Sequence, residues 1–102
     1  MATTTQQLEY VAIIRDVRVG TTTREYFRAP SYLEAKARFT GRGNIDSHVG
    51  PIAIQIVGVM PLSTVKTGEK VSILNPDDSI GEINHIVSSQ DNDPSIRCFF
   101  DV

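Results

Sequence analysis

The sequence predicts an α+β fold, with a small mixed or antiparallel sheet of about five to six strands and one main helix. Three observations indicate this class. Short runs rich in Val, Ile and Tyr recur along the chain, as they do in strands. One segment, residues 31–40, has helical periodicity and both of its end signals. The order of the segments predicts a ββαβ unit followed by a β-rich C-terminal half.

The length and composition fit a single domain. The 102 residues include 40% hydrophobic and 22% charged side chains, which is close to ordinary globular usage and argues against a disordered chain. Residues 1–7 are mostly polar and carry no charged side chain, and they are expected to form a disordered N-terminal tail. We expect a single α+β domain over residues 8–102.

The first two strands are predicted to form a hairpin. Residues 8–19 favour a strand that is apolar on both sides at residues 11–14. This pattern predicts a central strand covered on both faces, or a strand at an interface. Residues 20–22 are the expected turn, and residues 23–28 the second strand of an antiparallel pair.

Residues 31–40 carry the strongest local signal. Ser31 and Glu34 have capping-box spacing, in which the hydroxyl accepts from the amide of residue 34 and the carboxylate reaches back. Glu34 and Arg38 have the spacing of an ion pair on the solvent side, and Gly41 suits a C-terminal cap. Tyr32, Ala35 and Phe39 are expected to share a docking face, with Leu33 and Ala37 beside them.

The later segments are also expected to be strands. Residues 52–59 form the clearest buried strand, and residues 70–74 form another before a firm turn at residues 75–79. Residues 95–102 are expected to end the chain as an alternating strand.

Residues 80–88 have two interpretations. Ser79 and Glu82 form a second capping box, which favours a helix. The β-branched residues and Gly81 favour a strand instead. We expect a strand that forms a hairpin across the preceding turn.

The chain shows no catalytic or metal-binding pattern. Asp46, Ser47 and His48 are adjacent in sequence, whereas a catalytic triad is assembled by geometry across a fold. Cys98 lies in an apolar strand pattern that predicts a buried thiol. Asp91 and Asp93 offer oxygens for calcium, but the calcium-loop pattern is not met. We expect no enzyme activity, no cofactor and no metal.

Charge is distributed unevenly along the chain. Residues 1–50 hold seven Lys or Arg and five Asp or Glu, whereas residues 51–102 hold three and seven. The net charge of −2 is unlike that of a dedicated nucleic-acid binder. The arginines of the hairpin, Arg15 to Arg28, nevertheless interleave with Tyr26 and Phe27. A single-stranded nucleic-acid-binding module is therefore the alternative hypothesis.

These observations predict a small, non-catalytic protein-interaction module that acts through a sheet surface and the loop at residues 41–51. An accessory, decoration or inhibitor-type protein of a phage or mobile element is expected, in the cytoplasm, with a protein partner or with self-association into a homo-oligomer. No membrane partner is expected, because the longest apolar stretch is too short to span a bilayer. The candidate partner-binding residues are Arg24, Tyr26, Arg28, Arg38, Arg42, Asn44, Asp46 and His48.

Overall fold

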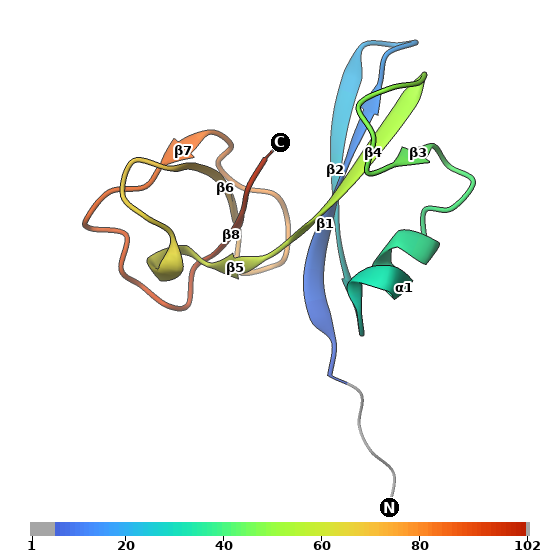
Figure 1. The fold of residues 1–102 in the computed structure, drawn as a ribbon. Helices are drawn as coiled ribbons and strands as arrows, with labels where there is room; N and C mark the ends of the chain where they lie inside the picture. Colours follow the sequence, from blue (N-terminus) through green and yellow to red (C-terminus); the bar gives the residue numbers. More distant parts are fainter. Residues whose placement is uncertain (1–5, 102) are drawn as a thin grey trace, which may run out of the picture. The chain divides into compact units, whose positions relative to one another are not determined.

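The computed structural model describes residues 6–101 and shows a small, mostly β protein (Figure 1). Strands make up 42% and helices 9%, in two four-stranded sheets, one mixed and one antiparallel, with one short α-helix. The helix and the β-rich second half were predicted, but the sequence predicted one sheet. The chain divides into two compact units, Met1–Ile56 and Val57–Val102.

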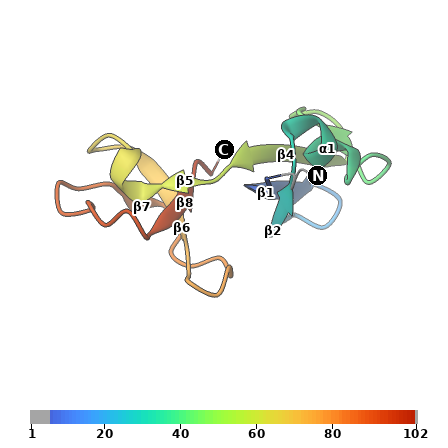
Figure 2. The ribbon, with the colours of Figure 1, turned by 90° about the horizontal axis from the view of Figure 1, so that it is seen from below.

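The first unit contains a mixed sheet with strand order β2-β1-β4-β3. Its elements in chain order are β1 (Leu8–Asp16), β2 (Thr21–Ala29), α1 (Tyr32–Ala37), β3 (Asn44–Ile45) and β4 (Ile52–Gly58). The predicted ββαβ order is therefore present, with the short strand β3 added in the loop. Figure 2 shows α1 over one face of this sheet.

The hairpin of β1 and β2 pairs without interruption from Leu8 opposite Ala29 to Asp16 opposite Thr21. The first strand ends three residues earlier than predicted because Asp16 starts the turn. Its backbone carbonyl accepts from Gly20 N at 2.8 Å, and its carboxylate accepts from Arg18 N at 3.0 Å. Gly20 has φ +70°, a conformation that glycine adopts without steric cost. The turn therefore spans residues 17–20 rather than 20–22.

β1 is the central strand predicted from its apolar middle. It lies between β2 and β4, and every residue from Tyr10 to Ile13 is buried. Side chains alternate between faces, so both faces of the strand are covered. The face under α1 carries one core cluster: Tyr10, Ala12, Ala29, Ala35, Phe39, Ile54 and Ile56.

The helix is shorter than predicted. Ser31 is its N-cap, with the hydroxyl accepting from Glu34 N at 3.2 Å, so this half of the capping box is confirmed. α1 ends at Ala37 because Phe39 N and Thr40 N donate to carbonyls three residues back, which tightens the chain. Arg38, rather than Gly41, is the C-cap.

The predicted docking face of the helix is only partly correct. Ala35 and Phe39 are buried, but Tyr32 is 42% exposed. Beside this face, Leu33 is 76% exposed and Ala37 is also exposed. The Arg38 guanidinium lies over the Phe27 ring, 5.5 Å from its centroid. Residues 6–101 include no ion pair between Arg38 and Glu34.

The second unit contains an antiparallel sheet with strand order β5-β8-β6-β7. Its elements are β5 (Met60–Pro61), a 3-10 helix (Leu62–Thr64), β6 (Lys70–Leu74), β7 (His85–Ile86) and β8 (Arg97–Phe99). One cluster of its buried core consists of Leu62, Val71, Val87 and Cys98. β6 has the predicted bounds.

Residues 80–88 form an interrupted strand, so the helical interpretation is wrong. Asn75 N donates to Ser79 O at 2.9 Å across the predicted turn. Leu74 then pairs with Ile80, and Lys70 pairs with Ile86. The second strand contains two more residues than its partner between these pairs, so it bulges.

The last strand is shorter than predicted. β8 has three residues, whereas a strand over residues 95–102 was expected. Its simple alternation is also wrong, because Cys98 and Phe99 are both fully buried while Phe100 is 37% exposed. Val102 and most of the predicted tail, residues 1–5, lie outside the described residues.

Candidate functional site

The structure separates the predicted partner-binding residues of β2 and the arginines that follow α1 onto two faces. Because side chains alternate along a strand, Arg24, Tyr26 and Arg28 share one face of β2. Glu25 and Phe27 share the other, and Phe27 packs against the core cluster beneath α1. Tyr26 and Phe27 therefore cannot form one continuous aromatic surface.

A polar network orders the first face. The Tyr26 hydroxyl donates to Glu9 Oε1 at 2.5 Å, and Arg28 Nε donates to the Tyr26 hydroxyl oxygen at 2.9 Å. Glu9 lies directly opposite Arg28 in the strand register. Burial and the hydrogen bond to Glu9 raise the pKa of Tyr26, so the phenol stays a donor at neutral pH. The Arg28 side chain remains 55% exposed.

Two further arginines lie on the other face. Arg42 Nη1 and Nη2 donate to the Glu25 carboxylate at 3.2 and 3.4 Å, and its guanidinium lies over the Phe39 ring, 4.8 Å from the centroid. The Arg42 side chain is 49% exposed. Together with Arg38 over Phe27, these contacts place guanidinium groups beside β2 on this face as well.

We use the name β2 surface for the strand and the side chains that flank it on both faces. Its members are Arg24, Tyr26, Arg28, Arg38 and Arg42. Five of the eight residues predicted from the sequence therefore gather around one edge strand.

The three loop candidates hold the loop together. Asn44 Nδ2 donates to Val49 O at 2.7 Å, and Gln55 Nε2 lies 2.9 Å from His48 Nε2. Asp46 accepts from the Tyr32 hydroxyl at 2.6 Å and pairs with Lys36 Nζ at 3.1 Å. These internal contacts explain the three side chains as parts of the loop, so we leave them outside the β2 surface.

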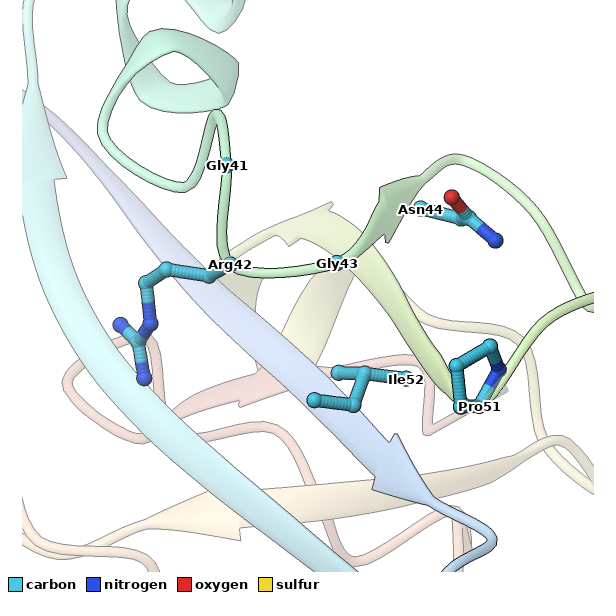
Figure 3. A pocket seen from close by; sticks show the side chains of 6 residues that line it. All are labelled: Gly41, Arg42, Gly43, Asn44, Pro51 and Ile52. Atoms are coloured by element: carbon cyan, nitrogen blue, oxygen red, sulfur yellow. The ribbon is translucent and has the colours of Figure 1, made fainter.

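A small depression lies where this loop meets β4 (Figure 3). Its volume is about 260 Å³, below the range of about 300–1,000 Å³ that is usual for ligand pockets. It is lined by Gly41, Arg42, Gly43, Asn44, Pro51 and Ile52. Figure 3 shows the Arg42 side chain pointing away from Asn44 and Pro51, so polar groups do not converge on one point.

The residues that the sequence analysis considered for catalysis have separate partners. Asp46 and His48 have the separate partners given above, and the Ser47 hydroxyl accepts from Val49 N at 3.0 Å. Cys98 is fully buried, as predicted, and burial raises the pKa of its thiol to about 11. A protonated thiol is a poor nucleophile.

The aspartates considered for calcium are turn residues. Asp91 Oδ2 accepts from Ser88 N at 2.7 Å, and Asp93 Oδ1 accepts from Ser95 N at 2.9 Å. Residues 6–101 contain no group of three or more His, Cys, Asp or Glu side chains that could hold a metal ion.

The sequence interpretation missed the pairing of two acidic side chains with arginines of the β2 surface. Glu9 and Glu25 hold Arg28 and Arg42, respectively. The pairing of Glu9 with Arg28 follows from the strand register, which the turn sets. The turn expected at residues 20–22 gives a different register, so the contact between Glu9 and Arg28 could not be predicted. Asp16, the last residue of β1, was the missed signal, because its carboxylate accepts from the turn.

In the part of the chain that the structure describes, no helix is long and apolar enough to cross a membrane. No protein-family model matches the sequence, and neither the curated proteins nor the solved structures include a significant match.

Proposed function

We propose that this chain is a non-catalytic protein-interaction module that binds its partner at the β2 surface. The observation that supports the proposal most directly is the position of four arginines on both faces of one edge strand. Arginine is enriched at protein interfaces because its planar fork pairs with carboxylates and also stacks on aromatic rings.

The aromatic side chains favour a protein over a single-stranded nucleic acid. Stacking of successive bases needs several exposed rings on one surface. Here the Phe27 ring packs 5.2 Å from the Phe39 ring and 5.9 Å from the Tyr10 ring, within the core. On the opposite face, Tyr26 is held by Glu9 and Arg28. The β2 surface therefore offers charge but little stacking area.

The test is photo-crosslinking of the full chain in its native cells. A photoreactive phenylalanine analogue replaces Thr22, which lies exposed on β2. We expect a discrete protein adduct that Arg28→Glu reduces by about tenfold. The substitution removes the contact of this arginine with the partner and places a negative charge in its position. Lys66→Glu makes the same change of charge at an exposed position of the second unit and is expected to leave the adduct unchanged.

Absence of an adduct, or equal loss with both variants, contradicts the proposal. The nucleic-acid alternative is measured in parallel by fluorescence anisotropy of a labelled oligothymidylate at low salt. Binding that weakens with added salt and with Arg24→Ala or Arg28→Ala, without a protein adduct, would replace this proposal by the nucleic-acid one.

A further inference from the structure

The outer edge of β2 is long and regular. All nine of its residues pair with β1 in one register, without a bulge. Among the described strands of this sheet, none follows β2 on its outer side. Natural proteins usually keep edge strands short, or interrupt them with proline or a bulge, because an edge carries unpaired N–H and C=O groups. β2 is nine residues long and has neither a proline nor a bulge.

The charges beside this edge are arranged for a strand whose side chains alternate. Arg24, Tyr26 and Arg28 follow one another at every second position of β2, so their side chains lie in a row on one face. Arg42 and Arg38 lie on the other face, over Phe39 and Phe27. A strand added beside β2 would therefore direct alternate side chains toward arginines on both faces.

We propose that β2 accepts an extended acidic segment of a partner protein as an additional strand of the sheet. This inference rests on the proposed function and specifies the partner that the β2 surface takes. Backbone hydrogen bonds to the open edge hold the segment, and its Asp or Glu side chains select it by pairing with the guanidinium groups.

Charge complementarity also argues against a second copy of β2 as the occupant. In antiparallel pairing about a two-fold axis, the register that uses all nine residues places Glu25 opposite its own copy. The two neighbouring registers that keep side chains on matching faces place Arg24 opposite Arg28 or opposite its own copy. Like charges directly opposite each other destabilise a strand pair. The arginines thus disfavour self-pairing and favour an acidic strand.

The first experiment is a display selection of random peptides of about twelve residues against the full chain. We expect enrichment of sequences with Asp or Glu at alternate positions and without internal proline. The doubly substituted bait, Arg24→Glu with Arg28→Glu, should lose these peptides and enrich Lys or Arg at the positions of one alternate set. A Lys66→Glu bait is the control and should select the same peptides as the unchanged chain.

The second experiment needs no variant of the protein, so it does not depend on how a substitution affects folding. The backbone amides of one selected peptide are N-methylated in two alternate sets. Alternate N–H groups of an extended strand point to the same side, so one set faces β2 and the other faces solvent. We expect one set to weaken binding by about a hundredfold and the other to leave it nearly unchanged.

Equal effects of the two methylated sets, or peptides that bind the charge-reversed bait unchanged, would overturn strand addition. Dimers of the unligated chain that crosslink from Thr22 to Thr22 would assign the edge to a second copy and overturn it too. A protein adduct at Thr22 without selection of alternating acidic peptides would leave the proposed function in place and remove only this inference. Absence of a protein adduct at Thr22 together with failure of the peptide selection would remove both the proposed function and this inference.

Discussion

The Tyr32 hydroxyl donates a hydrogen bond of 2.6 Å to Asp46 Oδ1, which joins the first residue of α1 to the turn after β3. Lys36 Nζ lies 3.1 Å from the other carboxylate oxygen. Asp46 has φ +57°, in the left-handed region that aspartate and asparagine tolerate better than most residues. The hydrogen bond from Tyr32, with Lys36, holds the pKa of Asp46 below its usual value.

Asp46→Asn is expected to lower the free energy of unfolding by about 1 kcal/mol at neutral pH, measured by urea denaturation. Asparagine keeps the backbone conformation, so the loss reports the charge. Because the folded-state pKa is depressed, the stabilisation is present above the unfolded pKa of 3.8 and disappears as the pH falls through the folded value. The difference between the two proteins should therefore shrink below pH 3.8. A difference that persists in acid would contradict this origin.

His85 is predicted to make the second unit sensitive to pH. Its Nε2 lies 2.9 Å from Asp91 Oδ2 and its Nδ1 lies 3.0 Å from Glu82 Oε2. The hydrogen bond to Asp91 raises the pKa of His85 against the opposing effect of burial. The pKa of Asp91 is lowered by its hydrogen bonds from Ser88 N and from His85.

The contact between His85 and Asp91 should be strongest at pH values above the lowered pKa of Asp91 and below the raised pKa of His85. A raised histidine pKa gives stabilisation that is complete below the unfolded value of 6.5 and is lost as the pH rises through the folded value. Hydrogen-exchange protection of the Ser88 amide should therefore fall as the pH rises above 6.5, after correction for intrinsic exchange. His85→Gln should abolish this dependence and His48→Gln should retain it. An unchanged profile in His85→Gln would refute the assignment.

Gly43→Ala is predicted to weaken the pairing of β3 with β4. A Cβ at this position would lie 2.7 Å from Ile52 O and 2.7 Å from Ile52 Cγ2, so backbone would have to move. We expect a loss of about 1–3 kcal/mol in urea unfolding. Gly58→Ala is the matched control in β4, because nothing lies within 4 Å of its Cβ position. Equal effects of the two substitutions would show that space at Gly43 is not the cause.

The Cys98 thiol is predicted to be unreactive in the native protein. It has no exposed surface, and burial raises its pKa to about 11, so little thiolate forms at pH 8. Labelling with a thiol-specific disulfide reagent should proceed only as fast as the protein opens. Denaturant should accelerate it to the rate of a free cysteine. Rapid labelling without denaturant would contradict the buried position of β8.

Local signals in the sequence identified elements well, whereas contacts between distant segments were hard to predict. The Ser31 cap and the bounds of β6 follow from neighbouring residues, and both were correct. The end of β1 was wrong because Asp16 binds the turn through its side chain and its carbonyl, which strand propensity does not reveal. The division of the strands into two sheets depends on pairing between segments far apart in sequence, so it was not predicted.

In the candidate site, too, local signals were informative and contacts between distant segments were not. The two-residue period places Arg24 and Arg28 on one face directly from the sequence. The position of Arg42 depends on how the chain leaves α1, and its contact with Glu25 joins residues seventeen positions apart. A basic cluster could thus be predicted, but not the acidic side chains that position it.

The uninterrupted hairpin also has a consequence for the order in which the protein forms during synthesis. Residues 8–29 are contiguous, so β1 and β2 can pair as soon as both have left the ribosome, through contacts of low sequence separation. β4, which lies on the other side of β1, begins only at Ile52. Until then the inner edge of β1 and its apolar residues are exposed in the nascent chain. During this interval the nascent chain is prone to aggregate, and a chaperone that binds apolar segments would protect it.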